Sequence, residues 1–166
     1  MTGAPELRTA QALLRPLRPG DAPDIAEGIA EWRVMRWLSA PPWPYGLADA
    51  EWFVTEGADS QTFGIEVEGR VVGVIGAGAE FGYWLAPPLW GQGIMSEVAA
   101  AVLAWRFGTD PSPLDSGYFL GNGPSRAVLT KHGFVPTRIV ARYHRPSAQA
   151  LALQEMVLTR EAWEAR

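Results

Sequence analysis

The chain has 166 residues, a formal net charge of −4 and no cysteine. This length fits a single domain over residues 1–166, and its hydrophobic content of 48% is typical of a globular protein. Because the sequence has no run of like charges, we expect no nucleic-acid partner. Without cysteine there is no disulfide, no thiol nucleophile and no thiolate zinc site, so we expect no metal. No apolar stretch reaches the ~18 residues of a membrane span, and no signal-peptide pattern opens the chain, which predicts a cytoplasmic protein without a membrane partner.

The N-terminal part of the chain is predicted to be mainly helical after one strand. A strand that ends at the turn signal Pro19-Gly20 precedes Asp21, which suits a helix N-cap. Prolines later impose an extended loop. The next helix is expected to turn Trp52, Phe53 and also Val54 inward. The strand is expected at residues 11–18 and the proline loop at 40–46. Helical stretches are expected at 21–30, 31–38 and 48–56.

Three short strands are predicted in the middle of the chain. Residues 62–68 alternate apolar and other side chains, as in a half-exposed strand. Residues 71–75 are continuously apolar, which is typical of a central strand buried on both faces. A third strand at 81–87 ends at Pro87-Pro88. Since the turns between them are tight, these strands are expected to form an antiparallel meander.

A glycine-rich turn leads from this meander into an alanine-rich helix. Gly91 and Gly93 allow the backbone to approach a ligand closely, and the free N–H groups of the helix start face that turn. This combination is typical of an anion-binding site. Apolar residues at helical spacing predict one buried face, which would hold the turn in place; these are Ile94, Val98, Ala101, Val102 and Trp105.

The C-terminal third is predicted to alternate strands with one helix. A short strand at 117–120 precedes a helix that starts near Pro124 and ends at His132-Gly133. Two final strands are expected at 134–144 and 152–159. The whole order of elements predicts a mixed α+β fold with a parallel crossover around the long helix.

Two motifs in this order resemble a known family. They are FGYWLAPPLWGQGIMSE at residues 81–97 and NGPSRAVLTKHGF at 122–134. Both are similar to segments of the GNAT superfamily of acetyl-CoA-dependent N-acetyltransferases, in particular its RimJ/RimL-like branch. The resemblance extends over nearly the whole chain. It implies a central, mostly antiparallel sheet with a V-shaped splay and helices on both faces, with acetyl-CoA as cosubstrate.

The resemblance also assigns a binding site for acetyl-CoA. The family loop pattern Q/R-x-x-G-x-G/A falls on residues 90–95, where Gly93 fits and Trp90 and Met95 depart from it. Backbone amides of this loop would hold the pyrophosphate, the edge of the preceding strand would pair with the pantetheine arm, and Asn122 would flank the arm. The implied cofactor-binding residues are Tyr83, Trp84, Leu85, Gly91, Gln92, Gly93, Ile94, Met95, Ser96, Asn122 and Ser125.

Acetyl transfer to an amine needs a neutral amine, a polarised carbonyl group and a proton for the departing thiolate. By the resemblance, Ser125 is the first candidate to supply that proton, and Tyr118 is an alternative. Glu80 is the candidate base. Glu97 and His144 are the other titratable groups considered, although Glu97 is accounted for by the helix dipole and His144 is expected to be exposed. Water relay of the proton is a further alternative.

The acceptor side of the site is predicted from aromatic residues. Trp37, Trp43 and Tyr45 are expected to form a partly apolar wall. The predicted function is N-acetylation of a protein N-terminus or a small-molecule amine. A non-catalytic module that binds acetyl-CoA or CoA on the same fold is the alternative. The resemblance is compatible with a monomer or a homodimer.

Overall fold

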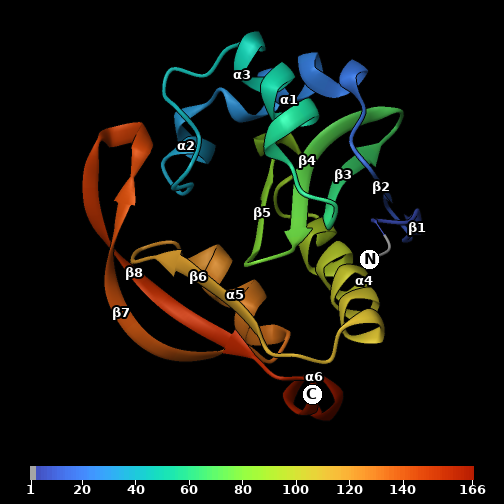
Figure 1. Cartoon of the computed structure of the whole chain (residues 1–166), viewed down its shortest axis with the longest axis vertical. Helices are drawn as coiled ribbons and strands as arrows, with labels where there is room; N and C mark the ends of the chain where they lie inside the picture. The colour runs from blue at the N-terminus through green and yellow to red at the C-terminus, as the bar shows by residue number, and fades with distance from the viewer. Residues whose placement is uncertain (1–2) are drawn as a thin grey trace.

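A computed structural model describes residues 3–166, whose strands form two sheets (Figure 1). Within each sheet, neighbouring strands are antiparallel. The five-stranded sheet has the order β1-β2-β3-β4-β5, with strands Leu7–Arg8, Leu13–Arg15, Thr62–Val67, Arg70–Ala77 and Phe81–Leu85. The three-stranded sheet has the order β6-β8-β7, with strands Leu114–Phe119, Gln149–Leu158 and Val135–His144.

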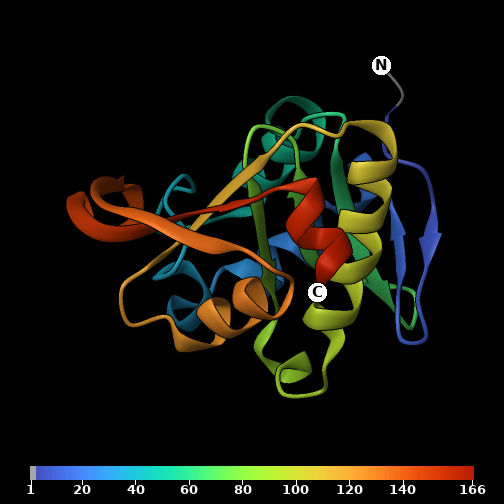
Figure 2. The ribbon, with the colours of Figure 1, turned by 90° about the horizontal axis from the view of Figure 1, so that it is seen from below.

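Helices cover both faces of the five-stranded sheet (Figures 1 and 2). The long helix α4 packs on one face together with parts of α5 and α6, and α1, α2 and α3 pack on the other. None of the described helices is long and apolar enough to cross a membrane. Their bounds are Ala22–Ile29, Trp32–Met35, Leu47–Trp52, Ile94–Thr109, Gly123–Lys131 and Arg160–Ala165 for α1 to α6.

The predicted α+β fold, its central meander and its crossover are confirmed. The strands β3, β4 and β5 pair in sequence as antiparallel neighbours. The chain then passes through α4 to β6, and a parallel bridge between Glu80 and Asp115 joins the two sheets. Helix α4 buries Ile94, Val98 and Val102 against the sheet, as the apolar spacing predicted.

Several element bounds differ from the prediction. The first strand is shorter than expected and pairs with β1, which is too short to show a periodic pattern. The strand β6 starts at Leu114 rather than at residue 117, because pairing with β8 extends it (Leu114 lies opposite Leu158). The helix α6 was not predicted; Thr159 caps it by accepting a hydrogen bond from the Ala162 N–H at 3.1 Å.

The inward orientation expected for Trp52 is wrong, since this side chain is 61% exposed. Helix α3 runs into a π-helical turn, Phe53–Gly57, which changes the direction in which successive side chains point. Phe53 and Val54 therefore pack against the core. The Trp52 ring lies over Gly57, where an added Cβ would come within 2.5 Å of it.

Asp21 precedes α1 as predicted, but its carboxylate does not cap that helix. It accepts two hydrogen bonds of 2.9 Å from the guanidinium of Arg15 and one of 2.7 Å from the Arg18 N–H. Arg15 also donates to Glu66 at 3.0 Å, so a buried ion-pair network joins β2 to β3 and to the start of α1. Burial opposes the charge on Asp21, but these hydrogen bonds hold the pKa of Asp21 below its ordinary value.

We predict that Arg15→Met lowers the free energy of unfolding by about 3–5 kcal/mol, because it leaves a buried carboxylate without its cation. In urea titrations, the control Arg70→Met removes an exposed pair and should cost less than about 1 kcal/mol. Since the pKa of Asp21 is lowered by folding, its contribution is present above the unfolded pKa of about 4 and is lost as pH falls through the folded pKa. Equal losses for the two variants would contradict this account.

Candidate active site

The two sheets meet at one point and separate from there. At the start of β5, Glu80 pairs in parallel with Asp115, and the Ser116 hydroxyl donates to the Phe81 carbonyl at 2.7 Å. Further along, β5 and β6 are the edge strands of their sheets, so the edges that face each other are not paired. A cavity of about 600 Å³ lies in this V-shaped opening. The predicted splay is therefore confirmed.

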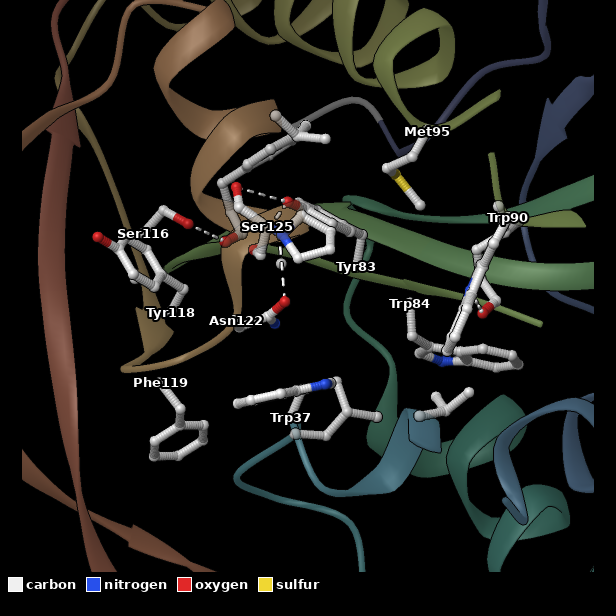
Figure 3. Close-up of a pocket in the computed structure, with 18 of the residues that line it drawn as sticks. Trp37, Tyr83, Trp84, Trp90, Met95, Ser116, Tyr118, Phe119, Asn122 and Ser125 are labelled. Carbon is white, nitrogen blue, oxygen red and sulfur yellow. Dashed lines mark hydrogen bonds between the residues drawn. The ribbon is translucent and has the colours of Figure 1, made fainter. Parts of the chain in front are cut away.

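The walls of the cavity come from both sheets and from three helices (Figure 3). Strand β5 provides one wall, β6 and the start of α5 provide the opposite wall, and the start of α4 closes one end. Helix α2 adds Arg33 and Val34, and the turn after it adds Trp37, whose ring comes close to the turn at Gly121, with 3.5 Å to a Cβ built there. The lining is mainly apolar and aromatic, as in many small-molecule sites.

The turn before α4 is shaped to receive a ligand. Gly91 and Gly93 both have φ +76°, a conformation that L side chains rarely adopt, and an added Cβ at either would have no neighbour within 4 Å. The first hydrogen bond within α4 runs from the Glu97 N–H to the Gly93 carbonyl at 3.1 Å. The N–H groups of residues 94–96 therefore have no partner within the helix, which favours an anion there.

Trp90, which departs from the family loop pattern, has a structural role here. Its indole N–H donates to the Leu85 carbonyl at 2.7 Å and so fixes the loop to the end of β5. The guanidinium of Arg33 lies 5.7 Å from the centre of the Trp90 ring. Gln11 holds the other side of the turn, donating from its side chain to the Gln92 carbonyl at 3.2 Å.

Three residues of β5 and α5 form a hydrogen-bonded group at the centre of the cavity (Figure 3). The hydroxyls of Tyr83 and Ser125 are 2.9 Å apart, and the Ser125 N–H donates to Asn122 Oδ1 at 3.3 Å. Burial raises the pKa of Tyr83 to about 12, although the hydrogen bond with Ser125 lowers it in part. Tyr83 is therefore neutral at physiological pH and orients the Ser125 hydroxyl.

The three titratable groups considered as bases lie in different surroundings. Glu80 lines the cavity and pairs with Arg142, with 3.1 Å between Oε1 and Nη2. Glu97 lies outside this cavity; hydrogen bonds from Thr9 and Gln11 lower its pKa. The expectation that His144 is exposed is wrong, since it is 1% exposed and its Nδ1 lies 2.6 Å from the Ser147 hydroxyl.

Most predicted site residues line the cavity. Among the cofactor-binding residues only Gln92 does not, because its side chain turns to the Pro88 carbonyl at 3.2 Å. The candidates Ser125, Glu80 and Tyr118 all line it, as does Trp37. The cofactor-binding residues that line it are Tyr83, Trp84, Leu85, Gly91, Gly93, Ile94, Met95, Ser96, Asn122 and Ser125.

The placement of Trp43 and Tyr45 in the acceptor wall is corrected by the structure. Neither lines the cavity. The Trp43 ring lies 5.2 Å from that of Trp32, and Tyr45 packs against the core formed by α1, α2 and α3. The proline loop thus carries its aromatic residues away from the site, and Trp37 alone of the three reaches it.

Sequence reasoning missed other lining residues, namely Ser116, Phe119 and Arg142. Ser116 and Phe119 lie on β6, part of which was assigned to a loop, and Arg142 reaches the cavity from β7. No local motif marks them, because the pairing of the C-terminal sheet brings them to the site. Among residues 3–166, no group of His, Asp and Glu is arranged to hold a metal ion.

A family model described as an acetyltransferase (GNAT) domain matches residues 11–135. The chain belongs to this family. No curated protein sequence matches it. The matched range includes the splayed strand, the glycine turn and the Asn122–Ser125 segment, whereas Arg142 and Leu153 line the cavity from beyond it.

Solved structures of GNAT enzymes share the fold. An acetyltransferase from Bacillus anthracis has a TM-score of 0.83 at 19% identity, over 95% of this chain and 99% of that one. The ribosomal-protein-S5-alanine acetyltransferase from Vibrio fischeri has a TM-score of 0.80 at 16% identity, over 96% and 99%. RimL, a ribosomal L7/L12 α-N-protein acetyltransferase in complex with coenzyme A, has a TM-score of 0.77 at 16% identity, over 95% and 99%. These neighbours show that the chain has the fold of these enzymes.

We predict a loss of stability at high pH that depends on Tyr83. Burial raises the pKa of both Tyr83 and Tyr45 to about 12, so the folded protein keeps protons that the unfolded chain releases above a pH of about 10. The free energy of unfolding should therefore fall between about pH 10 and 12. In urea titrations at several pH values, Tyr83→Phe should make this fall shallower, and Tyr45→Phe should do the same without altering the cavity. If Tyr83→Phe leaves the slope of the free energy of unfolding against pH unchanged, the pKa of Tyr83 is not raised by burial.

Proposed function

We propose that the protein is an N-acetyltransferase that transfers the acetyl group of acetyl-CoA directly to a primary amine. GNAT acetyltransferases use acetyl-CoA, and this chain belongs to that family. The observation that carries the proposal is a single cavity with an anion-binding turn at one end and the Tyr83–Ser125 pair at its centre. That arrangement suits a long donor with a phosphorylated end and a reactive thioester.

The residues present fit the donor. A pyrophosphate would lie against the N–H groups of residues 94–96, where glycine at 91 and 93 leaves open space. Binding there needs no lysine, because a helix N-terminus already favours an anion. The unpaired edge of β5 offers backbone groups to the amides of the pantetheine arm, as an added strand would.

In the proposed reaction, the amine nitrogen bonds to the acetyl carbon while the carbon–sulfur bond breaks. The ammonium form of the acceptor first loses one proton to a base or to water, and a second proton from the nitrogen balances the one gained by sulfur. Ser125 is placed to give the proton to sulfur, since Tyr83 orients its hydroxyl. Tyr118 remains the alternative donor. Glu80 is the carboxylate on the cavity wall that can receive the proton of the amine.

We predict that Gly93→Glu abolishes CoA binding while the fold is kept. The new carboxylate would stand in the open space of the turn and repel the pyrophosphate, and it would strain a left-handed position. Isothermal titration with CoA measures the loss, and circular dichroism checks the fold. Gly108→Glu places the same charge near the other end of α4, where an added Cβ also meets no atom within 4 Å, and should bind CoA normally. If Gly93→Glu keeps its affinity for CoA, the turn is not part of the CoA-binding site.

The Ser125 hydroxyl is the proposed donor of the proton to sulfur. If it supplies that proton, Ser125→Ala should lower kcat about 10²-fold with little change in CoA affinity. Release of free thiol from acetyl-CoA in the presence of amines measures kcat. Ser112→Ala, outside the cavity, is the control. An unchanged kcat would leave Ser125 as a residue that only stabilises the start of α5.

The same assay separates the enzyme from a non-catalytic module. A panel of N-terminal peptides, polyamines, aminoglycosides and amino acids tests turnover. If CoA raises the melting temperature and no amine in the panel yields thiol, the protein binds CoA without catalysis.

A further inference from the structure

Only three of the side chains that line the cavity are charged. They are Arg33, Glu80 and Arg142. Arg33 belongs to the end near the glycine turn, where it stacks on Trp90 and pairs with Glu31. Glu80 and Arg142 form a pair at the other end, where β5 and β6 meet. The part of the cavity remote from the anion-binding turn therefore presents one negative and one positive charge side by side.

The Glu80–Arg142 pair is open to a ligand. Two contacts join the carboxylate to the guanidinium, 3.1 Å from Nη2 to Oε1 and 3.5 Å from Nη1 to Oε2. The Glu80 side chain is 52% exposed and that of Arg142 is 31% exposed. A pair this accessible to solvent contributes little stability, so a ligand with charges of its own can exchange partners with it at small cost.

Arg142 is not held firmly by another carboxylate. Glu155 Oε2 lies 3.9 Å from its Nη2, but the other oxygen of Glu155 accepts a 2.6 Å hydrogen bond from Arg138. Arg138 does not line the cavity, whereas Arg142 does. Two arginines on the same strand thus share Glu155, and only one of them faces the site.

Apolar side chains line the same cavity as the charged pair. They are Trp37 from the turn after α2, Phe119 from β6 and Leu153 from β8. Phe119 and Leu153 lie opposite each other in the sheet. Phe119 is 4% exposed and Leu153 is 6% exposed, so both belong to the fixed wall. The cavity therefore offers two opposite charges and an apolar surface to one ligand.

We propose that the acceptor is a free α-amino acid, or a small amine of the same kind, with a carboxylate beside its amine and an apolar side chain. The inference rests on the proposed N-acetyltransferase function. The carboxylate of the acceptor pairs with Arg142, for which an arginine fork is well suited. Its ammonium pairs with Glu80, and its side chain lies against Trp37, Phe119 and Leu153.

This exchange of partners balances charge and places a base at the amine. The zwitterion is neutral and so is the pair that receives it, which leaves no unpaired charge in the cavity. Once Arg142 turns to the ligand carboxylate, Glu80 faces the ammonium and can take the proton that must leave before the nitrogen attacks. A peptide N-terminus brings a positive charge without a neighbouring carboxylate and cannot complete the exchange.

The test compares each amino acid with its own amide in the thiol-release assay. Phenylalanine, leucine, methionine and tryptophan are assayed beside their amides, with phenethylamine and a Phe-Ala dipeptide as further acceptors. For at least one of these amino acids, kcat/KM should be at least about tenfold higher than for its amide, because the amide cannot form the charged contact with arginine. Arg142→Gln should reduce this ratio to within about twofold of one. The control Arg160→Gln removes an exposed arginine that pairs with Glu164 outside the cavity, and it should leave the ratio above about tenfold.

The outcomes separate this inference from the proposed function. If amides or phenethylamine react as well as the free acids, the acceptor inference is wrong and amine acetylation stands. If only the dipeptide reacts, the acceptor is a peptide N-terminus and the inference is again wrong. The inference is also wrong if Arg160→Gln lowers the ratio as much as Arg142→Gln does. If CoA binds and no amine reacts, both proposals fail together.

Discussion

The site depends on the way in which β5 and β6 part from each other. They pair only where Glu80 meets Asp115 and where Ser116 reaches the Phe81 carbonyl. Beyond this point, each strand keeps an unpaired edge, which a closed sheet would not allow. The opening accounts for both the cavity and its chemistry, because a ligand between the strands meets backbone groups on one side and the start of α5 on the other.

Charge is distributed unevenly along the cavity. At the turn before α4, backbone amides and the helix dipole favour an anion, and Lys131, the only lysine in the chain, lines a neighbouring surface pocket together with Gly93 and Ser96. The centre holds neutral hydroxyls, since burial keeps Tyr83 protonated. Ionic groups reappear at the far end as the Glu80–Arg142 pair. This order suits a donor that enters with its phosphates at one end and an acceptor that arrives from the other.

Local signals predicted much of the fold and the glycine turn at one end of the cavity. The meander, the helix α4, and Gly91 and Gly93 follow from short-range patterns, because a positive φ or a buried helix face restricts residue type directly. The acceptor half was harder to predict. Aromatic residues on a proline loop indicate burial but not its direction, so Trp43 and Tyr45 were assigned to a wall that they do not form. His144, expected at the surface, is buried by the C-terminal sheet.

The sequence by itself determined the order of the strands and helices from β2 to β8, the glycine turn and the family to which the chain belongs. These features depend on neighbouring residues, whose spacing is visible along the chain. Only the tertiary structure decided which distant side chains share the cavity. Glu80 meets Arg142 across 62 positions, and Tyr83 meets Ser125 across 42. Such pairs depend on strand register and on the angle at which two sheets separate, and neither quantity is encoded by any short segment.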